Sequence, residues 1–177
     1  MRPLWAGGVP GLSVHRDPGG IGPAPAQGGE EEDGFVKSLV SACLLGCPCR
    51  YDGGTRGDPE LIAALGEEAL AFCPEVEGGL PTPRPRAFFV GGDGAQVWEG
   101  KASVRDEEGR DLTAQFRRGA VRALAAALAE GCKEGLLKDG SPSCGLSRVD
   151  IQGHKVQGLG VTAALFLRAG WTLRGHD

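Results

Sequence analysis

The chain has 177 residues, the length of about one domain, and a formal net charge of −4. This balance gives no support to binding of a nucleic-acid backbone, which needs a basic surplus. No stretch near the start is apolar enough for a secretion signal, and no run suits a membrane span. We therefore expect a cytoplasmic protein with no membrane partner, and the composition gives no strong evidence for nucleic-acid binding.

Residues 1–34 differ in composition from the rest of the chain. They hold 9 Gly and 5 Pro, no Cys and only isolated apolar residues. Such a stretch cannot bury enough surface to fold, so it predicts a disordered Gly/Pro-rich N-terminal extension. A start site assigned too far upstream would give the same pattern. Residues 35–177 are long enough to form one hydrophobic core and are the predicted folded domain.

The first half of this domain begins with short apolar runs. Residues 35–42 are β-branched and apolar and predict a buried first strand. Pro59 is typical of a first helical position and predicts a helix over residues 60–70. Residues 70–72 predict a second strand.

The middle of the chain contains a Pro-rich segment and the clearest helix. Residues 78–86 (GGLPTPRPR) are too rich in Pro for regular structure. Residues 87–90 and 96–98 flank a Gly-rich turn, which predicts a hairpin outside the main sheet. Apolar residues recur every four positions over residues 112–130, which predicts a long amphipathic helix.

The last third returns to alternating elements. Residues 135–138 predict a third strand, residues 160–169 a last helix and residues 171–173 a terminal strand. Strands that alternate with helices indicate an α/β fold. We expect a single domain with a small, mainly parallel, open (Rossmann-like) sheet flanked by helices, with hairpin insertions.

Six cysteines lie in the folded part, at positions 43, 47, 49, 73, 132 and 144. Without a secretion signal a disulfide framework is not expected. Three of them crowd into residues 43–49 around Gly and Pro, which suits a metal cradle better than a packed core. Their C-x3-C-x-C spacing matches neither zinc knuckles nor ferredoxins, so the spacing leaves the metal open.

Three of these cysteines follow predicted strands. Cys43, Cys73 and Cys144 each lie at or just beyond the carboxyl end of a strand. Ligand crevices in open parallel sheets form at that edge. We therefore expect the three thiols to converge on a shared metal or catalytic site.

The motifs around these cysteines resemble those of the DUF523 family, whose characterised members are thiouracil desulfurases. The resemblance runs from Leu39 to about Gly170. It is carried by SACLLG (41–46), CRYDG (49–53), CPE (73–75), GGLPTPR (78–84), SPSCG (141–145) and GLGVTAAL (158–165). It implies a 4Fe-4S cluster held by Cys43, Cys73 and Cys144, whose fourth iron is left open for substrate sulfur.

The other three cysteines depart from this pattern in different ways. Cys47 and Cys132 stand outside the family motifs and are expected to be structural. Cys49 belongs to a motif yet is not among the three implied ligands. A supporting or sulfur-handling role for Cys49 stays open.

The implied chemistry is a hydrolysis without redox change. A thiocarbonyl sulfur held by iron makes the ring carbon electrophilic, and water activated by a carboxylate would then replace the sulfur. Glu75 is the first candidate for the acid or base because it lies two residues after a ligand. Asp52 is the second, with a turn residue as the alternative. Ser143 either bonds the cluster or substrate, or caps its own loop.

Three further features have competing interpretations. Arg84 and Arg86 are either a clamp for a nucleotide phosphate or surface residues. Residues 158–163 match a dinucleotide fingerprint but lack the opening strand and the acidic partner, so these glycines are expected to allow close approach at a helix start. His154 is expected in an exposed loop.

The sequence thus predicts an iron-sulfur desulfurase acting on 2-thiouracil-like pyrimidines or related thio-compounds. The substrate would be a small thiolated base or nucleotide, and a sulfur acceptor is an open partner. One alternative is a non-catalytic zinc module closed by Cys43, Cys49, Cys73 and Cys144. Another is a thiol redox sensor that uses Cys47 and Cys49. The natural substrate, free or within tRNA, stays open.

Overall fold

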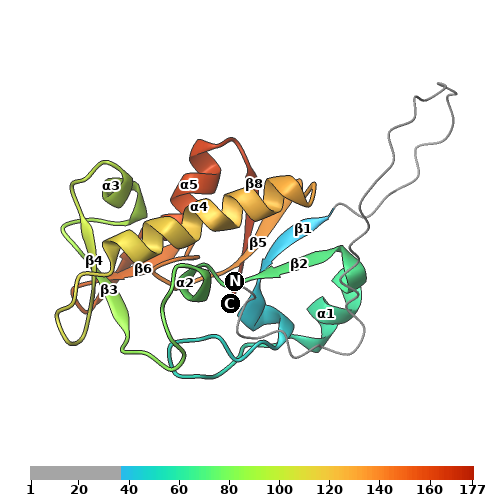
Figure 1. Cartoon of the computed structure of the whole chain (residues 1–177), viewed down its shortest axis with the longest axis horizontal. Coiled ribbons are helices and arrows are strands. Elements are labelled where there is room, and N and C mark those ends of the chain that lie inside the picture. The colour runs from blue at the N-terminus through green and yellow to red at the C-terminus, as the bar shows by residue number, and fades with distance from the viewer. Residues whose placement is uncertain (1–36) are drawn as a thin grey trace, which may run out of the picture.

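The computed structural model describes residues 37–177 (Figure 1). The predicted N-terminal extension, residues 1–34, lies outside them. The described elements follow in chain order: β1 (Ser38–Ser41), the 3₁₀ helix η1 (Ala42–Leu45), α1 (Pro59–Leu65), the 3₁₀ helix η2 (Gly66–Glu68), β2 (Ala69–Phe72), α2 (Pro74–Glu77), β3 (Ala87–Val90), α3 (Gly94–Trp98), β4 (Ser103–Asp106), α4 (Thr113–Ala129), β5 (Glu134–Lys138), β6 (Arg148–Ile151), β7 (His154–Gln157), α5 (Val161–Arg168) and β8 (Thr172–His176).

The strands form two sheets of four. The first is parallel throughout, in the order β2-β1-β5-β8, and β1 is buried along its whole length. The second is mixed, in the order β4-β3-β6-β7, with antiparallel pairs at both ends. An α/β fold with a parallel open sheet and hairpin insertions is therefore confirmed.

Helix α4 connects the two sheets. In Figure 1 it crosses from the mixed sheet to the parallel sheet, and it packs against α2 and α5. Its buried residues belong to two apolar clusters: Phe116 packs with Phe89 of β3, and Ala123 packs with Leu39 of β1. Neither α4 nor any other helix within residues 37–177 is long and apolar enough to cross a bilayer.

The predicted helix over residues 112–130 is confirmed, but not its apolar face. The face that is buried carries Phe116, Ala120 and Ala127, whereas Leu128 is 63% exposed. A step of four residues overshoots one turn of 3.6 residues by about 40°. Repeated steps therefore rotate the pattern away from the core.

The expected hairpin at residues 87–98 is only half correct. Residues 87–90 form β3, but residues 96–98 belong to helix α3. Asp93 caps this helix: its carboxylate accepts a hydrogen bond from Ala95 N at 2.8 Å, and its N–H donates to Gln96 Oε1 at 2.9 Å. This capping box starts a helix where a strand was expected, and the antiparallel partner of β3 is β4.

Two other boundaries also differ from expectation. The helix that begins at Pro59 ends at Leu65 because Gly66 adopts a positive φ of 49°. Leu70 belongs instead to β2, where it pairs with Leu39. His154 is exposed as predicted, but it lies in β7 rather than in a loop.

Candidate active site

The three cysteines singled out by the sequence follow three neighbouring parallel strands. β1 runs directly into η1, which contains Cys43. β2 is followed by Cys73, the N-cap residue of α2, and β5 is followed by the loop that contains Cys144. Because β2, β1 and β5 are adjacent and parallel, their carboxyl ends lie at one edge of the sheet.

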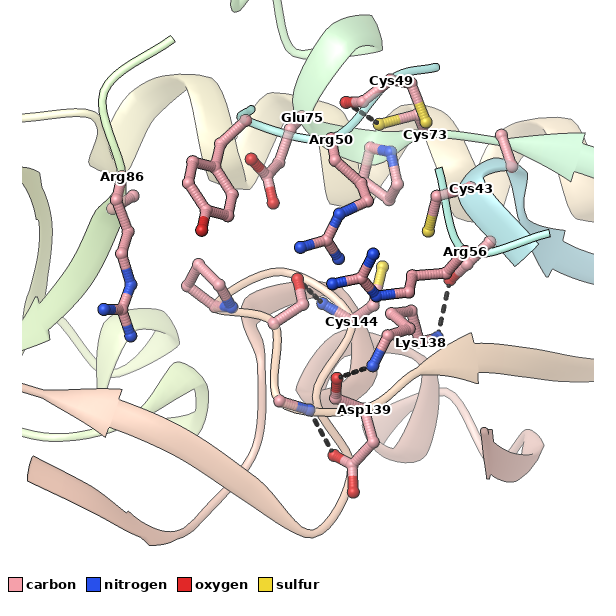
Figure 2. Close-up of a pocket in the computed structure, with 18 of the residues that line it drawn as sticks. Cys43, Cys49, Arg50, Arg56, Cys73, Glu75, Arg86, Lys138, Asp139 and Cys144 are labelled. Atoms are coloured by element: carbon pink, nitrogen blue, oxygen red, sulfur yellow. Dashed lines mark hydrogen bonds between the residues drawn. The ribbon is translucent and has the colours of Figure 1, made fainter. Parts of the chain in front are cut away.

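A cavity of about 410 Å³ opens at this edge. Its volume falls within the usual range for small-molecule sites. Cys43, Cys49, Cys73 and Cys144 all line it, and Figure 2 shows Arg86 on the opposite side from these thiols. The structure therefore brings the three expected ligands together and adds Cys49 to them.

The remaining cysteines do not line this cavity. Cys47 is 5% exposed and packs in an apolar cluster with residues of η1. Cys132 is also buried, among apolar residues under α4 and α5. Both positions agree with the structural role expected for these two thiols.

The segment after Cys49 folds back over Cys43. The carbonyl oxygen of Cys43 accepts hydrogen bonds from Thr55 Oγ1 and from Arg56 N, both at 2.9 Å. Asp58 N donates to Leu44 O at 3.0 Å. These bonds hold the loop that carries the first ligand and place Arg56 beside it.

A second set of bonds holds the loop of Cys144. Asp139 Oδ1 accepts from Gly140 N and Leu146 N, both at 2.8 Å. Burial alone would raise the pKa of Asp139, but the hydrogen bonds from Ser147 and the backbone hold that pKa below its ordinary value. A Cβ atom at Gly160 would collide with the Ser143 carbonyl oxygen, so this glycine allows close approach at a helix start, as predicted.

Cys49 lies beside two of the expected ligands, and Cys73 Sγ donates a hydrogen bond to Cys49 O at 3.8 Å. Interaction with the Cys43 and Cys73 thiols raises the pKa of Cys49, and the same interaction lowers the pKa of the other two. Burial raises the pKa of Cys144, so its thiolate needs a bound cation. Cys49 therefore lies next to two expected ligands, which is consistent with the supporting role left open for it.

The donor set suits an iron-sulfur cluster. Within residues 37–177 no group of three or more His, Cys, Asp or Glu side chains is arranged around a single ion. A cluster binds each thiolate through a different iron and accepts wider spacing. Cysteine thiolates are its usual ligands.

Glu75 lies at the wall of the same cavity, in the first turn of α2. Its Oε2 accepts hydrogen bonds from Arg84 Nε at 2.9 Å and from Arg84 Nη2 at 2.7 Å. The side chains of Glu75 and Arg84 are only 14% and 6% exposed. No described residue bonds Glu75 Oε1, so this oxygen is available to a molecule in the cavity.

Arg84 is saturated by protein partners. Besides Glu75, its guanidinium donates to Pro81 O at 3.0 Å, Thr82 Oγ1 at 3.1 Å and Cys49 O at 3.1 Å. These bonds use all five of its N–H donors, so Arg84 cannot clamp a phosphate. It connects the Glu75 helix to the Cys49 loop instead.

The structure does not bring Asp52 or Ser143 into the cavity. Asp52 is 43% exposed, and its Oδ1 accepts from Gly54 N at 3.0 Å in a turn, a bond that lowers the pKa of Asp52. Ser143 is buried, and its hydroxyl bonds Thr162 Oγ1 at 2.9 Å. Of the three candidates, only Glu75 lines the cavity.

Sequence reasoning overlooked most of the positive charge of the site. Seven Arg and Lys side chains line the cavity but only three Asp and Glu, although the whole chain is acidic. Arg50 and Arg56 flank the Gly-rich turn after Cys49, and Lys138 immediately precedes the Cys144 loop. Their position beside the ligand motifs was the available signal.

Soft thiolate donors beside the Glu75 carboxylate indicate an α/β enzyme that works through a thiolate-bound metal centre. The family model described as 2-thiouracil desulfurase matches residues 39–177, and the chain belongs to this family. The chain is 39% identical over 137 residues to the uncharacterized protein YbbK of Bacillus subtilis strain 168. The matched region spans 75% of this chain and 91% of YbbK. Among solved structures it is similar to the 4Fe-4S-dependent thiouracil desulfidase TudS, with a TM-score of 0.69 and 47% identity over 80% of this chain and 91% of that one.

Proposed function

We propose that this protein is a 4Fe-4S-dependent enzyme that converts the C=S group of a thiolated pyrimidine, such as 2-thiouracil, into C=O. Family membership and the similarity to TudS support the reaction. The observation that carries it to particular residues is the meeting of Cys43, Cys73 and Cys144 in one cavity with Glu75.

Cys43, Cys73 and Cys144 would hold the cluster, and Cys49 would have a supporting role beside Cys73. When bound, a cluster with three protein ligands supplies an iron that can polarise a soft sulfur as a Lewis acid. The redox-sensor alternative is less consistent with the site, because Cys47 does not line the cavity that Cys49 lines.

Glu75 would hold the proton of the attacking water. Arg84 fixes its Oε2, which leaves Oε1 to face a water molecule in the cavity. The water oxygen forms a bond to the ring carbon, and the sulfur leaves with both electrons of its bond as hydrosulfide. One proton of water ends on sulfur and the other on Glu75, so the reaction needs neither oxidant nor reductant.

The far side of the cavity favours a substrate with an anionic group. Arg86 lies on that side and pairs with Asp150 at 2.7 Å, and Lys155, which also lines the cavity, is the register partner of Asp150. A bare pyrimidine needs no such charge, so we propose that a thiolated nucleotide places its phosphate there. The assignment predicts a higher kcat/KM for thiouridine monophosphate than for thiouracil, and it predicts that Lys155→Gln lowers the value for the nucleotide. Equal kcat/KM values for the two substrates in the wild type would refute it.

The proposed location is the cytoplasm. All six cysteines are free thiols, as a reducing compartment would keep them. The partner proposed beyond the substrate is an acceptor for the released sulfur. Labelled sulfide recovered on another molecule in a cell extract would identify that acceptor, whereas free sulfide alone would argue against one.

The role of Glu75 is tested by Glu75→Gln, which keeps the size of the side chain but removes its basicity. The variant should keep its iron, while uracil formation from 2-thiouracil falls by about 100-fold or more. Glu77→Gln is the matched control, because Glu77 lies on the same helix but not in the cavity. Loss of iron would make Glu75 structural, and near-normal turnover would assign the proton transfer elsewhere.

A further inference from the structure

Two aromatic side chains line the cavity, Tyr51 and Phe72. Phe72 is the last residue of β2 and packs against the apolar cluster that contains Leu39, so the core covers part of it. Tyr51 packs in none of the apolar clusters formed by residues 37–177, and it is 39% exposed. Tyr51 is therefore the aromatic ring of the cavity that the core leaves uncovered.

Two contacts hold Tyr51 in place. Its carbonyl oxygen accepts a hydrogen bond from Arg84 N at 2.8 Å, which fastens its main chain to the Pro-rich loop. The guanidinium carbon of Arg50 lies over its ring, 5.6 Å from the ring centroid, in a cation–π contact. A ring that is already ordered binds a flat ligand with a smaller loss of entropy than a mobile ring would.

The position of Tyr51 connects the thiols with the carboxylate. Tyr51 lies two residues after Cys49, and Arg84 bonds Tyr51 O, Cys49 O and Glu75 Oε2. In Figure 2 the Glu75 carboxylate and the Arg50 guanidinium both point into the cavity. A flat ligand on the Tyr51 ring would therefore lie within the space that the thiols and Glu75 share.

The shape of the ligand decides how much it gains from such a ring. A pyrimidine is flat, and each base stacked on an aromatic side chain contributes about 1–3 kcal/mol to binding. A saturated or acyclic thio-compound has no flat face to stack and gains much less. The contact does not involve the sulfur, so it is available to the thiolated base and to the base that leaves.

We propose that the Tyr51 ring stacks on the pyrimidine and selects flat aromatic thio-bases over saturated or acyclic thio-compounds. This inference rests on the proposed desulfuration, because it names the residue that recognises the ring of its substrate. Tyr51 takes no part in the chemical step. Because stacking acts alike before and during the reaction, its loss should raise Kd and KM.

The test is calorimetric binding of uracil, and of its saturated and non-planar counterpart dihydrouracil, to the cluster-loaded protein. The wild type should bind uracil at least about fivefold more tightly than dihydrouracil. Tyr51→Leu should raise the Kd for uracil by about 5- to 100-fold and the Kd for dihydrouracil much less. Tyr51→Phe keeps the ring and should keep most of the affinity. Ile62→Ala removes an apolar side chain that is 36% exposed on α1, outside the cavity, and should leave both Kd values unchanged.

The inference is overturned if Tyr51→Leu binds uracil as tightly as the wild type does. It is also overturned if the wild type does not distinguish uracil from dihydrouracil. This second comparison needs no variant, so it decides even if Tyr51→Leu fails to fold. A wild type that prefers uracil to dihydrouracil but forms no uracil from 2-thiouracil would refute the proposed desulfuration and not the stacking.

Discussion

Six thiols of the same intrinsic chemistry have different environments in this protein. Cys47 and Cys132 lie among apolar side chains, where a thiol acts as a small hydrophobe. Cys43 and Cys73 are polarised by the Cys49 thiol, which lowers their pKa. Their positions, rather than their number, decide which of them can hold a metal centre.

Replacement of single cysteines should separate these roles. Cys43→Ala, Cys73→Ala and Cys144→Ala should each lose most of the bound iron, because each removes one ligand. Cys47→Ala and Cys132→Ala should keep it. The measurement is iron and acid-labile sulfide per chain after anaerobic reconstitution. If Cys49→Ala loses as much iron as the first three, four protein ligands are present and the open-iron account is wrong.

Arg84 should matter through Glu75 rather than through the substrate. Arg84→Ala leaves a buried carboxylate without its cation, which typically costs about 3 kcal/mol or more of folding stability. In the fraction that folds and holds iron, kcat should fall at least tenfold while KM stays close to normal. Added guanidinium should restore part of kcat. Arg110→Ala, which breaks a partly exposed ion pair with Asp106 away from the cavity, is the control. A normal kcat in Arg84→Ala would refute the positioning role.

At the scale of elements, the length of the apolar pattern in each segment decided how well the sequence predicted it. Residues 135–138 and 112–130 carry long enough apolar patterns to define a strand and a helix. Helix α3 has five residues and no periodicity, so only its capping box at Asp93 indicated it. Strand β4 (SVRD) is too polar to read as a strand and forms only because it pairs with β3.

The same limit applies to the site. The three strand-end cysteines could be placed from the order of strands and helices, because parallel strands share an edge. Arg50 and Arg56 could not, since the direction of their side chains depends on how residues 50–58 fold back onto Cys43. Tertiary hydrogen bonds, not local pattern, set that loop.

The contact between α2 and α4 offers a test at this scale. Gly119 of α4 lies against the Pro74 carbonyl, and a Cβ atom at that position would collide with it. Gly119→Ala should therefore push α2 away, destabilise the fold by about 1–3 kcal/mol and lower turnover through Glu75. Thermal unfolding and activity of the same sample measure both effects.

Val121→Ala is the control for the Gly119 variant, since Val121 is 52% exposed on the same helix. Val121→Ala should change neither the free energy of unfolding nor the turnover by much. A Gly119→Ala protein with normal stability and normal turnover would show that the two helices need not approach so closely.

At the scale of the whole molecule, the cavity draws on both sheets. The parallel sheet contributes the thiols, and the mixed sheet contributes Asp150 from β6 and Lys155 from β7. Helix α4 packs beside both sheets and so fixes the distance between them. A thiolated base reaches the thiols only if this second sheet leaves room for it, which ties substrate choice to the hairpin of β6 and β7.

Residues 1–34 lie outside the residues that the structure describes. They contain no motif residue, and the family model begins at residue 39. We predict that their deletion leaves iron content, thermal midpoint and turnover unchanged. Differential scanning fluorimetry and iron analysis of the shortened chain measure this, and a large loss in either would move the domain boundary upstream.

The central claim is a hydrolysis without redox change at a thiolate-bound cluster. The most direct measurement is turnover of 2-thiouracil by the reconstituted protein in ¹⁸O-labelled water under anaerobic conditions, with no reductant or oxidant added. The account predicts uracil that carries one ¹⁸O at the former thiocarbonyl carbon, together with one sulfide per uracil. Uracil without the label, or a reaction that proceeds only with an added reductant, would contradict it.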